Sequence, residues 1–120
     1  MANYQFSLTQ VMQATNAILK KLTSASVFGG VTTDTRKIEE GMLFIALKGE
    51  NFDGHDFIAD AAKKGAIGAI VNKDYDISLI EDIDIDILAV DDTLKAYQDL
   101  AHFWRKKFNI PVMGKLLQKI

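Results

Sequence analysis

The 120-residue sequence contains no cysteine and only one proline, and it has no long apolar run. Without cysteine the chain can form neither disulfides nor cysteine metal sites, which fits a reducing compartment. No apolar stretch approaches the roughly 20 residues that a helix needs to cross a bilayer. The first residues, Met1 to Gln5, lack the basic and apolar regions of a signal peptide. We therefore expect a cytoplasmic protein that does not contact a membrane.

The chain also lacks an excess of positive charge and has few histidines. Its 14 Lys and Arg residues are outnumbered by 16 Asp and Glu residues, so the formal net charge is −2. A nucleic-acid-binding protein usually shows a basic face, so we expect no nucleic-acid partner. His55 and His102 are too far apart in sequence to support a histidine metal site. The apolar content of 48% fits one globular domain, which we expect to be a monomer.

The apolar residues that are present predict an α/β fold. Continuous apolar runs at residues 43–47 and 66–71 are typical of strands buried on both faces. Between them, residues 57–62 show helical spacing, with His55 or Asp56 as the predicted cap. This strand–helix–strand order favours parallel neighbours. We predict a single small domain with a mixed, mostly parallel sheet flanked by helices.

Helices are also predicted towards both ends of the chain. Ser7 is a good N-cap with Gln10 as its capping-box partner, and apolar residues at helical spacing continue to Leu22. A second apolar stripe runs from Leu94 to Phe108, after candidate caps at residues 91–93. We predict one helix from Ser7 to Leu22 and another along the second stripe.

The segments beside these helices read as loops and short strands. Residues 23–30 are predicted to form a loop, and residues 31–33 a short strand that ends near Asp34. Asn109 and Pro111 are predicted to end the last helix.

Isoleucine and aspartate alternate over residues 82–87. A period of two predicts a strand that exposes one acidic face to solvent. The alternative is a calcium loop, but the glycine and the terminal glutamate of an EF-hand are missing. We therefore favour the exposed strand and expect no metal site.

Polar residues gather in two loops on either side of the predicted strand 43–47. The first loop holds Thr33, Asp34, Thr35 and Arg36, and the second runs from Lys48 to His55. An arginine fork matches phosphate oxygens, and a threonine hydroxyl can pair with a nucleobase or a sugar. A glycine after a strand can bring backbone N–H groups close to an anion. The two loops predict a binding site for a polar, anionic small molecule.

Each part of this site also has a plainer interpretation. Asp34 can simply cap a turn and leave Arg36 on the surface, and Asp53-Gly54 is an ordinary turn dipeptide. The chain has no G-x-S-x-G elbow and no cysteine nucleophile. Gly114-Lys115 is no phosphate loop, because the upstream glycine and the following Ser or Thr are missing. We predict no catalytic residue in this chain.

The same two loops carry a family resemblance. Asp34-Thr35-Arg36-Lys37, the run from Leu43 to Glu50 and the run from Phe52 to Ile58 resemble the N-terminal domain of Mur ligases, which extend the peptidoglycan peptide in the bacterial cytoplasm. These residue runs are most similar to those of the branch that adds D-alanyl-D-alanine to UDP-N-acetylmuramoyl-tripeptide. The branch that adds diaminopimelate or lysine is the alternative, followed by a non-catalytic interaction module of the same fold.

The resemblance implies a role for the predicted site. In this family the N-terminal domain holds the UDP end of a UDP-N-acetylmuramoyl-peptide. The implied UDP-binding residues are Thr33, Asp34, Thr35, Arg36, Lys48, Gly49, Asp53, Gly54 and His55. The family's central domain binds ATP and Mg²⁺, and its C-terminal domain binds the incoming amino acid or dipeptide. We therefore expect no cofactor in this chain, and ATP and Mg²⁺ in the parent enzyme.

The resemblance also implies where this domain ends. We expect residues 1–112 to form the UDP-substrate-binding domain. Residues 113–120 are expected to be a truncated or foreign tail, at the point where the ATP-binding domain would begin. The parent is expected to be an ATP-dependent, amide-forming ligase, and this chain alone is expected to be inactive.

Overall fold

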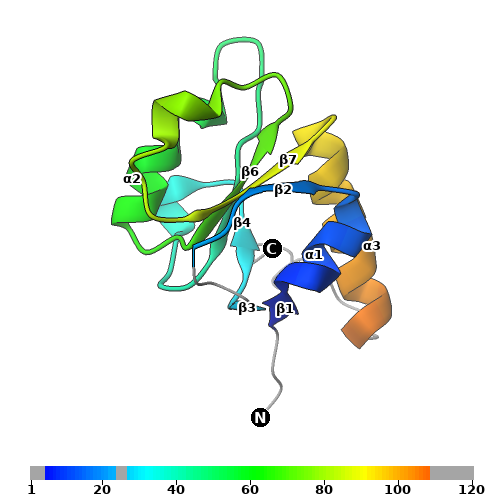
Figure 1. The fold of residues 1–120 in the computed structure, drawn as a ribbon. Helices are drawn as coiled ribbons and strands as arrows, with labels where there is room; N and C mark the ends of the chain where they lie inside the picture. The colour runs from blue at the N-terminus through cyan, green and yellow to red at the C-terminus, as the bar shows by residue number, and fades with distance from the viewer. Residues whose placement is uncertain (1–4, 24–26, 109–120) are drawn as a thin grey trace.

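The structure, a computed structural model, describes residues 5–23 and 27–108. Its centre is a five-stranded sheet in the order β2-β7-β6-β5-β4 (Figure 1). The strands from β4 to β7 pair in parallel, and β2 is antiparallel to β7. The strand bounds are Ile18–Lys21 for β2, Val31–Thr32 for β4, Leu43–Ile45 for β5, Gly68–Asn72 for β6 and Asp86–Val90 for β7. The predicted mixed, mostly parallel sheet is confirmed.

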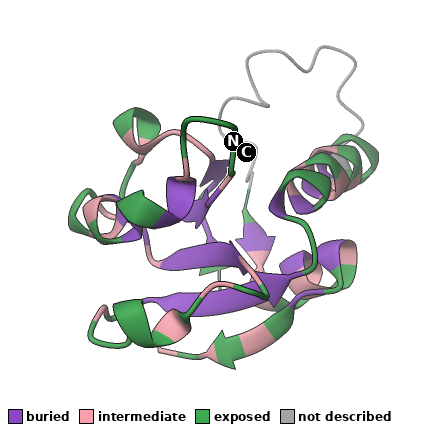
Figure 2. Ribbon diagram, turned by 90° about the horizontal axis from the view of Figure 1, so that it is seen from above, coloured by how far each residue is buried: buried purple, intermediate pink, exposed green. Residues whose placement is uncertain are grey.

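Helices cover both faces of this sheet, so that the domain has three layers. Alternate residues of a strand point to opposite faces. In β5, Leu43 and Ile45 join the core cluster under α1 (Leu8–Thr15) and α3 (Thr93–Phe108). Phe44 of the same strand joins the cluster under α2 (Ile58–Lys63). Figure 2 shows the buried residues concentrated in the sheet and the exposed ones on the outer faces of the helices. The predicted β5-α2-β6 unit is confirmed as parallel.

The first helix begins as predicted but ends early. Ser7 Oγ accepts from Gln10 N at 3.0 Å and Gln10 Oε1 accepts from Ser7 N at 2.9 Å, which completes the capping box. The helix stops at Thr15, and Asn16 adopts a left-handed φ of 58°. Asparagine tolerates this conformation better than most residues, so it reverses the chain here.

The predicted continuation of this helix to Leu22 is wrong. The chain instead forms β2, an edge strand that pairs with β7. The spacing of Ile18, Leu19 and Leu22 fits a helix as well as a strand with only one packed residue, so the pattern could not separate the two. Of these three, only Leu19 packs against the core, while Ile18 and Leu22 are exposed.

The predicted loop over residues 23–30 is also partly wrong, although residues 24–26 lie outside the described part of the chain. Val27–Phe28 form β3, which pairs antiparallel with β1 (Phe6–Ser7) in a separate two-stranded sheet. The side chains of Phe6 and Phe28 are fully buried in the core. Burial of this aromatic pair explains why so short a segment is extended.

The acidic alternation at residues 82–87 does not form an exposed strand. Strand β7 starts only at Asp86, and all of its residues are buried. The reason is its position between β2 and β6, where both faces of the sheet are covered. In the described residues 5–23 and 27–108, no group of His, Cys, Asp or Glu is placed to hold a metal ion.

The last helix, α3, follows β7 and confirms the predicted stripe in part. Asp92, from the predicted capping segment, accepts at Oδ1 from Leu94 N at 3.0 Å. Leu100 and Trp104 are buried as predicted, but Leu94 is 51% exposed and lies outside the stripe. The predicted stop at Asn109 and Pro111, like the tail 113–120, lies outside the described residues. No described helix combines the length and the apolar character needed to cross a bilayer.

Candidate functional site

A cavity of about 590 Å³ opens beside the carboxyl ends of β4 and β5. This edge of a parallel sheet is where α/β domains commonly bind ligands. Both predicted loops reach it. The polar lining consists of Thr33, Asp34, Thr35, Arg36, Lys48 and Gly49. The structure thus brings together six of the nine residues predicted for the site.

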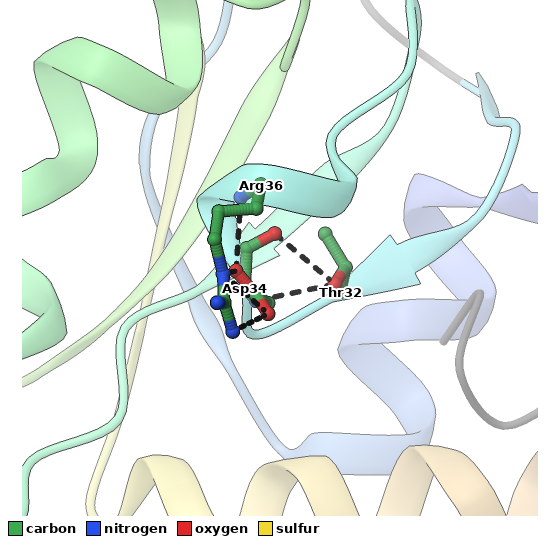
Figure 3. A network of polar contacts seen from close by, with 3 residues as sticks. All are labelled: Thr32, Asp34 and Arg36. Carbon is green, nitrogen blue, oxygen red and sulfur yellow. Dashed lines mark hydrogen bonds and ion pairs between the residues drawn. The ribbon is translucent and has the colours of Figure 1, made fainter.

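The first loop is shaped by a short network around Asp34 (Figure 3). Thr32 Oγ1 accepts from Asp34 N at 3.1 Å, and Asp34 Oδ1 accepts from Arg36 N at 2.9 Å. The latter bond makes Asp34 the N-cap of η1, a 3₁₀ turn over Thr35–Lys37. The plainer interpretation of Asp34 as a turn cap is therefore correct for its backbone contact.

Asp34 also holds the Arg36 side chain. The guanidinium donates from Nε to Oδ1 at 3.0 Å and from Nη2 to Oδ2 at 2.8 Å. The side-chain hydrogen bond from Arg36 is the main reason why the pKa of Asp34 falls to about 2. The Arg36 side chain is 85% exposed, and its guanidinium keeps further N–H donors. It is therefore oriented by Asp34 and still available to an anion.

The second loop closes on itself over residues 47–54. Gly54 N donates to Leu47 O at 2.6 Å, and Gly49 N donates to Phe52 O at 2.7 Å. Lys48 and Asp53 face each other as an isolated antiparallel bridge. The result is a compact hairpin-like loop that presents Lys48 and Gly49 to the cavity.

The cavity also has an apolar lining that the sequence patterns did not reveal. It is formed by Phe44, Leu47, Phe52, Phe57 and Leu94. The rings of Phe52 and Phe57 stack, with centroids 5.4 Å apart and planes at 15°. Both remain partly open to solvent, at 51% and 39% exposure. The sequence placed Phe57 on the buried face of a helix, which is wrong because α2 begins only at Ile58.

The other three predicted site residues, at the end of the second loop, lie outside this lining. Gly54 packs so closely that an added Cβ would lie 2.8 Å from Leu47 N. The ring of His55 is 4% exposed. Asp53 caps η2 (Gly54–Phe57), and the N-cap of α2 is Phe57 without a side-chain hydrogen bond, so the predicted cap at His55 or Asp56 is wrong. Asp53 and His55, together with Lys48, line a second, smaller hollow of about 280 Å³.

Asp53 and His55 form one hydrogen-bonded unit. Asp53 Oδ1 accepts from His55 N at 3.0 Å and lies 2.6 Å from His55 Nδ1. Burial raises the pKa of Asp53, but the hydrogen bonds from the His55 backbone and ring together lower it by more. The pKa of this carboxyl group therefore lies below its ordinary value, and Asp53 is an anion at neutral pH.

The cavity combines three kinds of contact on one ligand-sized surface. Arg36 and Lys48 supply positive charge, and the hydroxyls of Thr33 and Thr35 supply hydrogen bonds. The stacked rings supply a flat apolar wall. The volume is typical of small-molecule sites. The arrangement is suited to binding a molecule that carries both a ring and an anionic group.

Known proteins resemble the chain in sequence. The model described as "Mur ligase family, catalytic domain" matches residues 27–105. The UDP-N-acetylmuramoyl-tripeptide–D-alanyl-D-alanine ligase of Synechocystis sp. is 37% identical over 115 residues, which are 93% of this chain and 25% of that protein. The ligase of the same name from Escherichia coli is 45% identical over 96 residues, or 79% of this chain and 20% of that protein.

A second branch and a solved structure also match. A UDP-N-acetylmuramoyl-L-alanyl-D-glutamate–2,6-diaminopimelate ligase of Brucella melitensis is 48% identical over 63 residues, or 52% of this chain and 12% of that protein. The structure of a UDP-N-acetylmuramoylalanyl-D-glutamyl-2,6-diaminopimelate–D-alanyl-D-alanyl ligase from Acinetobacter baumannii superposes with a TM-score of 0.71 at 31% identity, covering 86% of this chain and 22% of that one. The chain thus spans a quarter or less of these proteins.

Proposed function

Because the chain belongs to the Mur ligase family, we propose that it is the N-terminal, substrate-binding domain of a ligase that adds D-alanyl-D-alanine to UDP-N-acetylmuramoyl-tripeptide in peptidoglycan synthesis. The family resemblance seen in the motifs is confirmed. Relatives of this ligase type cover most of the chain. A second candidate is the diaminopimelate-adding ligase, which the Brucella melitensis relative favours.

The observation that carries the binding role is the convergence of the two polar loops on one cavity. We propose that Arg36 and Lys48 meet the diphosphate of UDP, because both cations line the same cavity. Thr33 and Thr35 add hydroxyl groups for the ribose or the base. The stacked pair of Phe52 and Phe57 is suited to the flat uracil ring.

The remaining proposed site residues fit the same role in different ways. Asp34 orients Arg36, and Gly49 leaves the loop backbone open to the ligand. Asp53, Gly54 and His55 do not line the cavity but hold the end of the second loop in place.

We propose that the chemistry of the parent enzyme takes place outside this chain. The chain spans about a fifth of the Escherichia coli relative. In the proposed division, residues 1–112 hold the UDP-substrate. ATP and Mg²⁺ then belong to a central domain and the incoming dipeptide to a C-terminal one. The chain itself is a monomer in the cytoplasm and does not catalyse ligation.

A titration followed by NMR tests this proposal. Adding UDP and UDP-N-acetylmuramoyl-tripeptide to labelled protein is expected to shift the amides of residues 33–36 and 47–57 and of Leu94. Uridine without phosphate is expected to shift the signals near Thr33, Thr35, Phe52 and Phe57 and to leave the amide of Lys48 unchanged. An absence of shifts at millimolar UDP-N-acetylmuramoyl-tripeptide would contradict the binding role. Phosphate release from ATP with both substrates present would contradict the proposed inactivity.

Two pairs of variants separate a specific site from a general charge effect. Arg36→Ala and Lys48→Ala each remove a charge-assisted hydrogen bond and are expected to weaken UDP binding by about tenfold. The matched controls, Arg105→Ala and Lys106→Ala, remove exposed cations from the last turn of α3 and are expected to bind as the wild type does. Equal losses in both pairs would indicate unspecific attraction.

A further inference from the structure

His55 connects the second loop to the sheet through both nitrogens of its ring. Nδ1 lies 2.6 Å from Asp53 Oδ1, and Nε2 accepts from the backbone N of Asn72 at 3.0 Å. Asn72 is the last residue of β6 and pairs with Val90 of β7. The imidazole therefore joins the end of the second loop to a strand 17 residues further along the chain.

These two contacts fix the protonation of the ring. An Nε2 that accepts from a backbone N–H must carry a lone pair and no proton. A neutral ring then holds its proton on Nδ1, where the donor faces the Asp53 carboxylate. Asp53 is an anion at neutral pH and can only accept, so donor and acceptor match at both ends of the ring.

The environment of the ring leaves it little freedom. Its exposed fraction is 4%, and Tyr75 packs against it with ring centroids 4.8 Å apart. Asp53 is meanwhile occupied twice by His55, through the backbone N–H and the ring. Asp53 also faces Lys48 across the base of the loop. The position of the His55 ring therefore influences, through Asp53, the position of Lys48 in the cavity wall.

We infer that His55 is a positioning residue for the nucleotide cavity. Through Asp53 it holds the loop of residues 48–53 against the end of β6, so that Lys48, Gly49 and Phe52 keep their places in the lining. His55 itself is absent from that lining, so we expect its ring to make no contact with the ligand. The consequence for binding rests on the proposed function, whereas the anchoring contact can be tested without any ligand.

The test uses two substitutions with different hydrogen-bonding capacity. His55→Phe keeps an aromatic ring beside Tyr75 but removes both hydrogen bonds of the ring. His55→Gln has one amide donor and one acceptor and can satisfy both Asp53 and Asn72. His102→Gln, on an exposed position of α3, is the matched control. All variants are compared at a temperature well below their unfolding transitions.

The first readout needs no ligand. The ¹⁵N spectrum of the wild-type ring is expected to show a protonated Nδ1 and an unprotonated Nε2. Amide hydrogen exchange at Asn72, Gly54 and Gly49 is expected to rise about tenfold in His55→Phe and to remain near the wild-type rate in His55→Gln. A proton on Nε2 would overturn the inference, even if His55→Phe failed to fold.

The second readout is UDP binding. His55→Phe is expected to bind about tenfold more weakly than the wild type, while His55→Gln and His102→Gln stay within about twofold. Unchanged exchange and unchanged UDP affinity in His55→Phe would overturn the positioning role. A direct nuclear Overhauser contact between UDP and the His55 ring would overturn it as well, in favour of a ligand contact. A wild type that shows the expected ring but binds no UDP would instead refute the proposed function.

Discussion

Gly54 gives the sharpest test of how the second loop meets the sheet. A Cβ added at this position would lie 2.8 Å from Leu47 N, 2.9 Å from Leu47 O and 3.0 Å from Ala46 Cα. All three atoms are backbone, so no side chain can rotate away. Gly54→Ala must therefore move the loop away from the end of β5. The distance between the new Cβ and Leu47 N has to increase from 2.8 Å to the roughly 3.4 Å of an ordinary contact.

The expected cost follows from two losses and one gain. Overpacking of this kind costs about 1–3 kcal/mol. The hydrogen bond from Gly54 N to Leu47 O, 2.6 Å long, is also stretched or broken, for a further loss of about 1 kcal/mol. Alanine restricts the unfolded chain and returns about 0.4–1 kcal/mol. The net destabilisation is about 1–4 kcal/mol, a large share of the stability of a small domain.

Urea unfolding of the two variants Gly54→Ala and Gly49→Ala measures this cost with an internal control. Gly49 lies in the same loop, and its nearest contact would be Phe52 O at 3.9 Å, so Gly49→Ala is expected to be neutral or slightly stabilising. With a slope of about 1–3 kcal/mol per molar urea, a cost near the middle of that range should lower the midpoint for Gly54→Ala by about 1 M. Equal midpoints for the two variants would refute the close packing at Gly54.

Three further predictions concern charge and capping. Arg36→Ala should raise the pKa of Asp34 from about 2 towards its ordinary 3.8, as followed by NMR titration; because the folded pKa is lowered, the pair's small contribution to stability is present above pH 3.8 and is lost as the pH falls towards 2. Burial raises the pKa of Asp86, so the folded state loses stability as the pH rises through that pKa and the carboxyl group ionises. Asp86→Asn should therefore be more stable than the wild type in urea at pH 7, and the gain in stability should be smaller at pH 4. Ser7→Ala removes the cap of α1 and should cost about 1 kcal/mol in the same assay, whereas Ser78→Ala, at an exposed turn, should cost less.

The strands β5 and β6 could be predicted because each is a continuous apolar run in the sequence. The apolar run at residues 43–47 predicted β5 because a strand covered on both faces needs no alternation. Strand β2 was missed because an edge strand with one packed residue leaves a spacing that also fits a helix. The left-handed conformation of Asn16 ends the helix and allows the strand to follow. Asparagine is too common in helices and loops for its presence to predict this turn.

The sequence predicted six residues that line the cavity, but it did not predict how they are arranged. Asp34 and Asp53 each cap a short helical turn, but only Asp34 also lines the larger cavity. The sequence pattern around the two residues does not distinguish them. The ring of His55 accepts a hydrogen bond from Asn72, which the local motif does not contain. The apolar wall was missed because its members come from separate elements, and Leu94 enters it only through the position of α3.

One construction recurs after four successive strands of the sheet. In each case an aspartate accepts a hydrogen bond from the backbone N–H two residues later, at the start of a helical turn. The four pairs are Asp34 with Arg36, Asp53 with His55, Asp76 with Ser78, and Asp92 with Leu94. All four turns at this edge of the sheet thus begin with an aspartate, whereas the residue two positions later differs from one turn to the next.

This recurrence decides which groups can attract an anion here. A free helix N-terminus is a common anion site, but each of these four turns already has an aspartate on its first N–H groups. The carboxylates oppose a second anion at the turns themselves. The positive charge at the cavity must then come from the side chains of Arg36 and Lys48. Because Asp34 already neutralises part of the Arg36 charge, Lys48→Ala should weaken UDP binding at least as much as Arg36→Ala does, and the reverse order would contradict this account.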